Sequence, residues 1–225
     1  MAFRELVVVD DPGAEAGRRL DAAIRDAIAG RGTAAIGLSG GSAPAEMLPS
    51  LGADLDWSAV DIVQVDERVA PDGHPDRNLG PILEHLPDAA RSRVRPMPVT
   101  AADDLDAAAE AYAAALPERF DALQLGIGAD GHTASLVPGD PVLDVRDRDV
   151  ALTTEPYQGR RRMTLTYPAL ARAGLVIWLV TGGDKAMALR QLLADDPRIP
   201  ASGVATPRQV VVADPAAASS PRNGA

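Results

Sequence analysis

The chain contains no cysteine among its 225 residues, which removes two kinds of chemistry at once. Neither a disulfide framework nor a thiolate metal site can be built from it. Its three histidines, His74, His85 and His132, lack the spacing of a zinc site, so we expect no bound metal. The absence of cysteine also agrees with a reducing compartment.

Apolar residues are limited in kind and in run length. Aromatic residues make up only 3% of the chain although 46% is hydrophobic, so alanine, valine, leucine and isoleucine must fill the core. No run of about 20 apolar residues occurs, and we therefore predict no membrane span. Residues 1–5 lack the apolar region of a signal peptide. Together these features predict a soluble, cytoplasmic protein.

Positive charge is scarce. The chain has 22 lysines and arginines against 32 acidic residues, a net charge of −10, which argues against a nucleic-acid partner. If the ligand is a small anion, a few well-placed cations must overcome an unfavourable overall field. We expect a small-molecule partner and a monomer or weak homo-oligomer.

Strand-like apolar runs alternate with helix-like stretches along the chain. This alternation predicts βαβ units and a mainly parallel sheet flanked by helices, in one α/β domain over residues 1–215. Residues 216–225 are small and polar, and we expect a frayed tail. The predicted strands cover 6–9, 33–38, 60–65, 120–125, 162–166, 175–180 and 209–212, and the predicted helices cover 14–29, 44–51, 105–116 and 185–193.

Four loops follow predicted strands directly. They are residues 39–42, 66–68, 126–132 and 181–185. In a parallel sheet all four would gather at one edge, which is where ligands bind in open α/β folds. This convergence predicts a binding site more strongly than any one of the loops does.

The loop at 126–132 carries the candidate acid–base group. Its three glycines let the backbone approach a ligand closely, and Asp130 and His132 stand beside them at the end of a buried strand. Histidine has the unperturbed pKa that suits proton transfer near neutral pH. A histidine that only caps the following turn is the alternative, but this setting favours a functional one.

The other loops supply groups that can hold an anion. Residues 39–42, Ser-Gly-Gly-Ser, offer amide N–H groups and hydroxyls, although an ordinary capped helix would look the same. Lys185 begins a helix, and residues 160–162 place three arginines beside a strand; both arrangements are unfavourable unless an anion is near. Residues 37–41 also match the G-x-S-x-G turn of serine hydrolases, but only two strands precede Ser39, which disfavours that function.

These blocks resemble the 6-phosphogluconolactonases, within the family that they share with the glucosamine-6-phosphate deaminases. The stretch after His132 fits the lactonase version of the family, because the deaminases diverge there. The likeness rests on LSGGSAP at 38–44, VDERVAPDGHPDRN at 65–78, LGIGADGHTASLVPG at 125–139, RMTLTYP at 162–168 and VTGGDKA at 180–186.

The resemblance implies a Rossmann-like α/β fold of the deaminase, ribose-5-phosphate-isomerase and CoA-transferase type. It also implies hydrolysis of 6-phosphoglucono-1,5-lactone in the oxidative pentose phosphate pathway, with no metal and no organic cofactor. Carried over block by block, His132 is the general base and Asp130 and Glu67 are its catalytic neighbours. The groups that would hold the substrate and its phosphate are Gly40, Gly41, Ser42, Arg68, Arg162 and Lys185.

The resemblance leaves open the donor to the oxyanion and the role of Arg77. The tetrahedral oxyanion needs a donor, for which backbone N–H groups of the turn (Gly128, Gly131) or Arg68 are candidates. Arg77 stands where the family usually has serine, before Asn78, which leaves open its role at the pocket rim. The alternatives are an amino-sugar-phosphate deaminase or isomerase that uses the same pocket, and a sugar-phosphate sensor without catalysis.

Overall fold

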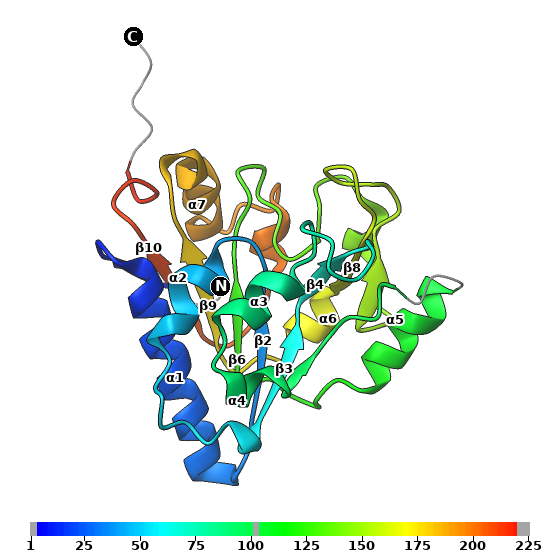
Figure 1. Cartoon of the computed structure of the whole chain (residues 1–225). Coiled ribbons are helices and arrows are strands. Elements are labelled where there is room, and N and C mark those ends of the chain that lie inside the picture. Colours follow the sequence, from blue (N-terminus) through cyan, green and yellow to red (C-terminus); the bar gives the residue numbers. More distant parts are fainter. Residues whose placement is uncertain (1–3, 101–103, 220–225) are drawn as a thin grey trace.

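The computed structural model describes residues 4–100 and 104–219, and its centre is a seven-stranded sheet. All of its strand pairs are parallel. In Figure 1 the strands run through the middle of the molecule with helices on either side. Across the sheet the strands are β1 (Arg4–Val8), β10 (Gln209–Ala213), β9 (Val176–Val180), β6 (Ala122–Leu125), β2 (Ala34–Leu38), β3 (Val60–Gln64) and β5 (Val94–Arg95).

Strands β10, β9, β6 and β2 are buried on both faces, which explains why they are almost continuously apolar, whereas the edge strand β1 is largely exposed. In β10, Val210 and Val212 pack into one core with α1 (Pro12–Arg31), whereas Val211 and Ala213 pack into the other. The second core also takes residues of α5 (Leu105–Ala114) and α7 (Ala186–Leu193). The predicted α/β class with a mainly parallel sheet is confirmed.

Helix boundaries follow local capping. The N-cap of α1 is Asp11, whose side chain accepts a hydrogen bond from the N–H of Ala14, and the helix ends at Gly32, which has φ of 80°. The predicted helix at 14–29 was therefore two residues short at each end. The predicted helix at 44–51 is a short α2 (Ala43–Met47) followed by a 3₁₀ turn at Leu48–Ser50. None of the described helices is long and apolar enough to cross a membrane.

Several short elements carry too weak a pattern to be predicted. They are α4 (Asp88–Arg91), α6 (Tyr167–Leu170), β5 and β7 (Val150–Leu152), whereas α3 (Leu79–His85) is a helix that the sequence does indicate, with His85 at its end. At the C-terminal end, residues 216–219 belong to a turn that buries Ala217, and the rest of the predicted frayed tail lies outside the described residues.

A second, antiparallel sheet of three strands stands beside the first one. Its order is β4 (Asp66–Arg68), β8 (Arg162–Leu165) and β7. The prediction of a loop at 66–68 was wrong, because each residue of this charged triplet pairs with a residue of β8. The predicted strand at 162–166 exists, but it belongs to this small sheet.

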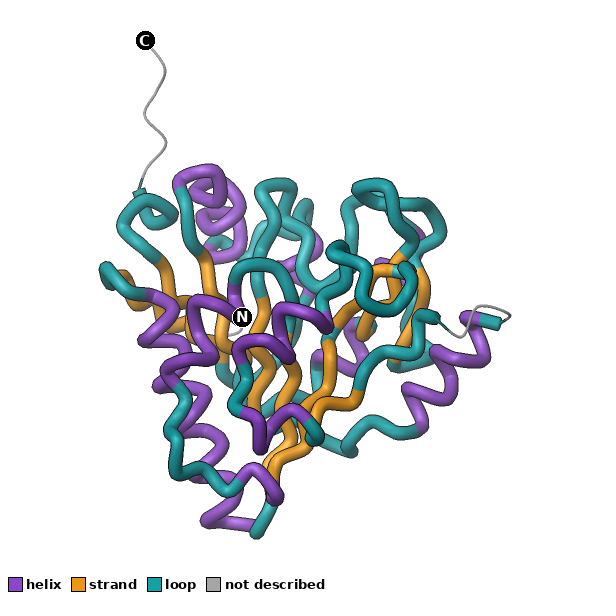
Figure 2. Tube along the Cα trace, in the orientation of Figure 1, coloured by secondary structure: helices purple, strands orange, loops and turns teal. Residues whose placement is uncertain are grey.

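The order of the strands creates a crevice. From β2 the chain moves outward through β3 to β5, and from β6 it moves in the opposite direction through β9 to β10. Between β2 and β6 the winding therefore reverses, and ligands bind at such switch points, beyond the carboxyl ends of the strands. Figure 2 shows loops gathered along that edge, at the top of the view.

Candidate functional site

A cleft of about 210 Å³ opens at the switch point between β2 and β6. All four predicted segments contribute to its wall, three as loops and 66–68 as strand β4, so their predicted convergence is confirmed. The polar and glycine residues of the lining are Ser39, Gly40, Gly41, Ser42, Asp66, Arg68, Asn78, Gly126, Gly128, His132, Arg162, Thr181 and Lys185.

Two arginines of the cleft stand directly opposite each other. Arg68 in β4 pairs with Arg162 in β8, and like charges at such positions repel. Burial lowers the pKa of Arg162 from its ordinary value, and the charge of Arg68 lowers it further. The Nε of each arginine is buried without a hydrogen-bond partner among the described residues. The pair therefore has unused donors and a surplus of positive charge.

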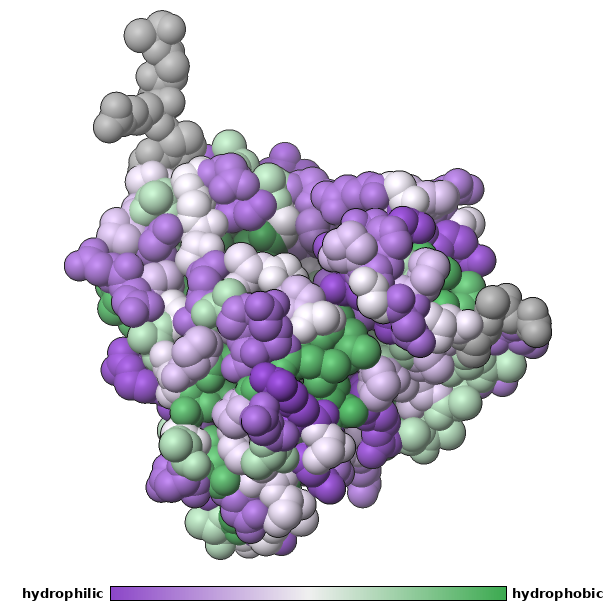
Figure 3. Space-filling model, in the orientation of Figure 1, coloured by the Kyte–Doolittle hydropathy of each residue, from purple (hydrophilic) through white to green (hydrophobic). Residues whose placement is uncertain are grey.

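The whole cleft is positive although the chain is strongly negative. Its lining holds three cationic side chains and one carboxylate, a formal balance of +2 when His132 is neutral, in a chain of net charge −10. The third cation is Lys185, which is the only lysine in the sequence and forms an ion pair with Asp184 at 2.9 Å. Figure 3 shows a largely hydrophilic surface on the face it presents, with scattered hydrophobic patches. The local charge of the cleft suits a phosphate, which carries about −1.5 to −2 at neutral pH.

The Ser-Gly-Gly-Ser loop after β2 keeps its backbone close to the cleft. A Cβ on Gly40 would overlap the side chain of Asn78, and Gly41 has φ of 77°, which favours glycine. Ser42 precedes α2 without making a side-chain cap bond. Ser39 differs from it, because its Oγ donates to the backbone oxygen of Gln124 at 3.1 Å. That bond occupies the hydroxyl proton and does not favour a serine nucleophile.

His132 borders the cleft and is held by Asp130. The Nδ1 of His132 lies 2.6 Å from Oδ1 of Asp130, which also accepts the backbone N–H of His132 at 3.2 Å. A carboxylate can only accept, so the ring proton sits on Nδ1 and the lone pair on Nε2. The histidine side chain is 23% exposed, so the ring meets both the protein and the cleft.

The two glycines expected to serve an oxyanion use their N–H groups within the turn. The N–H of Gly128 donates to the backbone oxygen of His132, and that of Gly131 donates to the oxygen of Gly128, both at 2.9 Å. These bonds fix the turn that presents His132. Of the predicted donors, Arg68 is the one that retains an unused N–H.

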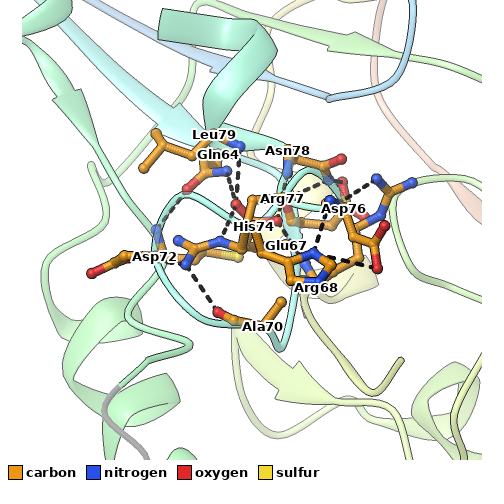
Figure 4. A network of polar contacts seen from close by, with 12 residues as sticks. Gln64, Glu67, Arg68, Ala70, Asp72, His74, Asp76, Arg77, Asn78 and Leu79 are labelled. Atoms are coloured by element: carbon orange, nitrogen blue, oxygen red, sulfur yellow. Dashed lines mark hydrogen bonds and ion pairs between the residues drawn. The ribbon is translucent and has the colours of Figure 1, made fainter. Parts of the chain in front are cut away.

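Glu67 lies outside the lining of the cleft, in the strand that carries Asp66 and Arg68. It is fully buried, and its carboxylate accepts four hydrogen bonds of 2.7–3.0 Å (Figure 4). The geometry gives this residue the task of holding the loop that follows β4. The four donors are the backbone N–H groups of Arg68, Asn78 and Leu79 and the side chain of Gln64.

Arg77 supplies the countercharge for this buried carboxylate. Its Nε lies 3.0 Å from Oε2 of Glu67, close enough for an ion pair although the N–H direction does not make a hydrogen bond. Its Nη1 donates to the backbone oxygen of Ala70 and to Asp72 (Figure 4). The side chain of Arg77 is only 5% exposed, so it lies inside the loop at residues 67–79 and is no part of the cleft lining.

Asp66 and Asn78 also line the cleft, although the resemblance assigned no role to either of them. Asp66 is buried, and burial raises its pKa, while Ser135 donates to its Oδ2 at 2.6 Å. Asn78 donates to Asp66, and its own Oδ1 is buried without a partner among the described residues. These two side chains offer acceptors for sugar hydroxyls. Both residues stand in charged or polar segments that follow a predicted strand. That position was the sequence feature from which they could have been identified.

Comparison with known proteins agrees with this geometry. Residues 10–213 match the model of the family described as glucosamine-6-phosphate isomerases/6-phosphogluconolactonase. A curated 6-phosphogluconolactonase of Mycobacterium tuberculosis is 39% identical over 212 residues, which cover 84% of this chain and 85% of the relative.

Solved structures show the same architecture. A 6-phosphogluconolactonase from Shewanella baltica is 26% identical, with a TM-score of 0.82, and the match covers 95% of this chain and 98% of that one. The fold also matches a 6-phosphogluconolactonase from Thermotoga maritima at a TM-score of 0.84, with 23% identity over 94% of this chain and 100% of that one.

Proposed function

Because the chain belongs to the family of glucosamine-6-phosphate isomerases and 6-phosphogluconolactonases, we propose that it hydrolyses 6-phosphoglucono-1,5-lactone to 6-phosphogluconate. This is the lactone-opening step of the oxidative pentose phosphate pathway. The observation that carries the proposal is one cleft that joins a paired-arginine anion site to a histidine with an available Nε2.

In the proposed reaction, Nε2 of His132 takes a proton from a water molecule as that water attacks the lactone carbonyl carbon. The carbonyl oxygen becomes an oxyanion in the tetrahedral intermediate. When the intermediate collapses, the bond to the ring oxygen breaks and His132 returns the proton to that oxygen. Asp130 keeps the imidazole in the required tautomer and stabilises its positive charge while it holds the extra proton.

The oxyanion is assigned to Arg68. Its Nε is buried and has no partner among the described residues, and a donor in place before the reaction costs no reorganisation when charge develops. Asp66 and Asn78 accept the sugar hydroxyls from the same side of the cleft. These contacts orient the lactone toward His132.

The phosphate is assigned to the remaining cations of the cleft and to the glycine loop after β2. Arg162, Lys185 and the loop at 40–42 supply charge and N–H donors to it. Binding at a distance from the carbonyl accelerates the reaction by fixing the geometry of the substrate. Phosphorylated lactone should therefore be preferred over the unphosphorylated compound.

The test is the rate on freshly prepared 6-phosphogluconolactone above its spontaneous hydrolysis. We expect His132→Ala to keep the fold and to lower kcat by about 10²–10⁴-fold, the usual contribution of general acid–base catalysis. His85→Ala is the matched control, because His85 ends α3 and is not part of the cleft lining. Equal kcat for wild type and the His132 variant would refute the assignment of the base.

A deaminase of the same family would need a base that reaches C2 of an amino sugar. Incubation with glucosamine-6-phosphate, followed by assay of ammonia, separates this activity from lactone hydrolysis. Tight lactone binding without rate acceleration would instead indicate a sensor.

We also propose that the enzyme works in the cytoplasm as a monomer or weak homo-oligomer. The net charge of −10 makes copies of the chain repel one another, which supports this state. Sedimentation velocity at several protein concentrations would measure it, and a concentration-independent dimer would contradict it.

A further inference from the structure

Tyr157 belongs to a tight hairpin turn between β7 and β8, and none of the predicted functional blocks contains it. Backbone bonds pair it with Arg160 in both directions, at 2.9 and 3.3 Å. The two residues between them, Gln158 and Gly159, have φ of 53° and 81°. Positive φ at both central positions is typical of the type I′ turn, which reverses a chain sharply and fixes the side chains beside it.

The phenol of Tyr157 contacts both members of the Asp130–His132 pair. Its hydroxyl donates to Oδ2 of Asp130 at 2.8 Å, and its ring centroid lies 5.3 Å from that of His132, edge to face. Asp130 therefore uses Oδ1 for the histidine and Oδ2 for the tyrosine. With both oxygens held, the carboxylate has a single orientation toward the imidazole.

The other face of the tyrosine meets an arginine of the anion site. The guanidinium carbon of Arg162 lies 5.0 Å from the ring centroid of Tyr157. Nη2 of the same arginine donates to the backbone oxygen of Tyr157 and to Oε1 of Gln158. One side chain thus stands between the group assigned to the phosphate and the pair assigned to proton transfer.

The ionisation of this cluster agrees with its hydrogen bonds. Burial would raise the pKa of Asp130, but hydrogen bonds from His132 and Tyr157 outweigh it and hold that pKa below its ordinary value. Burial, followed by the hydrogen bond to Asp130, raises the pKa of Tyr157 to about 12. The phenol therefore stays protonated, and remains a donor, at neutral pH.

We propose that Tyr157 is a positioning residue for the hydrolysis, which holds Asp130 and through it the ring of His132 while its ring supports Arg162. This rests on the proposed function of His132 as the base. Tyr157 is not part of the cleft lining and acts through Asp130. A tyrosine that only closes the hairpin would make the same backbone bonds. The test must therefore measure proton transfer by the Asp130–His132 pair.

The direction of the pH effect follows from the sharing of the carboxylate. Without the hydrogen bond from the phenol, the negative charge of Asp130 is shared with His132 alone. The protonated form of the imidazole is then stabilised more strongly than in the wild type. The acid limb of the plot of kcat/KM against pH should then move to higher pH. Asp130→Asn removes the carboxylate and should move the same limb to lower pH. The other charged groups around the cleft are Asp66, Arg68, Arg162 and Lys185, which both variants leave in place.

The experiment compares Tyr157→Phe with Tyr167→Phe. The control also loses a hydroxyl bonded at 2.8 Å, but to the backbone oxygen of Pro200 and away from the cleft lining. We expect Tyr157→Phe to lower kcat about 10-fold, since misplacement of a reacting group costs up to about 100-fold. Its KM should change less than about twofold, because the ring still supports Arg162.

The pH profile and His132→Ala complete the test. If Tyr157→Phe matches Tyr167→Phe in kcat and in the acid limb, Tyr157 only closes the hairpin and the proposal is overturned. A lower kcat without movement of the acid limb overturns it as well, because the effect then bypasses the pair. Loss of activity in His132→Ala beside a neutral Tyr157→Phe would leave the proposed base intact. A fully active His132→Ala would instead refute the base itself.

Discussion

Arg68 and Arg162 face each other across β4 and β8 in the lining of a single cleft. Their register is that of a directly opposed antiparallel pair, where like charges destabilise a sheet. An anion between them would remove that penalty and use the two unpaired Nε groups. The pair therefore links the stability of the small sheet to ligand binding.

This linkage predicts stabilisation by inorganic phosphate. A ligand at about ten times its Kd stabilises the folded state by about 1.4 kcal/mol, or about 3–6 °C in melting temperature for a chain of this size. Arg162→Gln should lose most of this increment, whereas Arg161→Gln, at the exposed neighbouring position, should keep it. Sodium chloride at matched ionic strength controls for screening. An equal increment in both variants would contradict the arginine pair as the anion site.

We expect Lys185 to bind the phosphate group of the substrate and not the lactone ring. Lys185→Met is expected to raise KM for phosphorylated lactone about 10- to 100-fold, the value of one hydrogen bond to a charged group, with a smaller effect on kcat. Steady-state kinetics on glucono-1,5-lactone, which lacks the phosphate, should be unchanged. Arg190→Met removes an exposed cation from α7, the helix that Lys185 immediately precedes, and serves as the control. Equal losses on both lactones would show that Lys185 does something other than hold phosphate.

The main sheet could be predicted because its strands carry a strong physical signal. A strand buried on both faces must be largely apolar, as 176–180 and 210–213 are, and glycine turns mark where such strands end. The position of His132 followed from that pattern, since it comes seven residues after a buried strand at a glycine turn. The cleft could thus be located from local sequence and the rule for parallel sheets.

The remaining features depend on contacts that local sequence does not encode. The triplet 66–68 has the composition of a solvated loop, and only pairing with β8 makes it a strand. Glu67 has the same appearance as its neighbours, but it is turned away from the cleft and neutralised by Arg77. Tyr157 and Asp130 are 27 residues apart in the sequence, and a hairpin turn brings them together. The alternation of apolar and polar residues does not predict the type of that turn.

Gly128 offers a test of the turn that presents the base. A Cβ at this position would overlap Nδ1 of His132 and lie close to Oδ1 of Asp130, whereas one at Gly126 would meet nothing within 4 Å. Gly128→Ala should therefore lower kcat by about 100-fold or more through displacement of the pair. Gly126→Ala, two residues earlier in the same loop, leaves the pair in place and should retain kcat, while any effect of its methyl group on the cleft should appear in KM. Similar kcat values for the two variants would show that the ring position in this turn does not limit the reaction.

Arg77 should matter for folding rather than for substrate. Arg77→Ser leaves the fully buried Glu67 without its countercharge, and breaking a buried ion pair in this way costs about 3–5 kcal/mol in the free energy of unfolding. Arg148→Ser, which removes an exposed arginine paired with exposed Asp147, should cost less than about 1 kcal/mol. Urea denaturation at pH 7 measures both.

A third variant separates charge from shape. Arg77→Lys keeps the positive charge but not the fork of donors that reaches Ala70 and Asp72, so it should recover part of the lost stability. KM for the lactone should stay near the wild-type value in every variant that folds, since Arg77 is not part of the cleft lining. If Arg77→Ser were as stable as Arg148→Ser, the four hydrogen bonds to Glu67 would suffice to keep its charge buried, and the arginine would be dispensable to the loop.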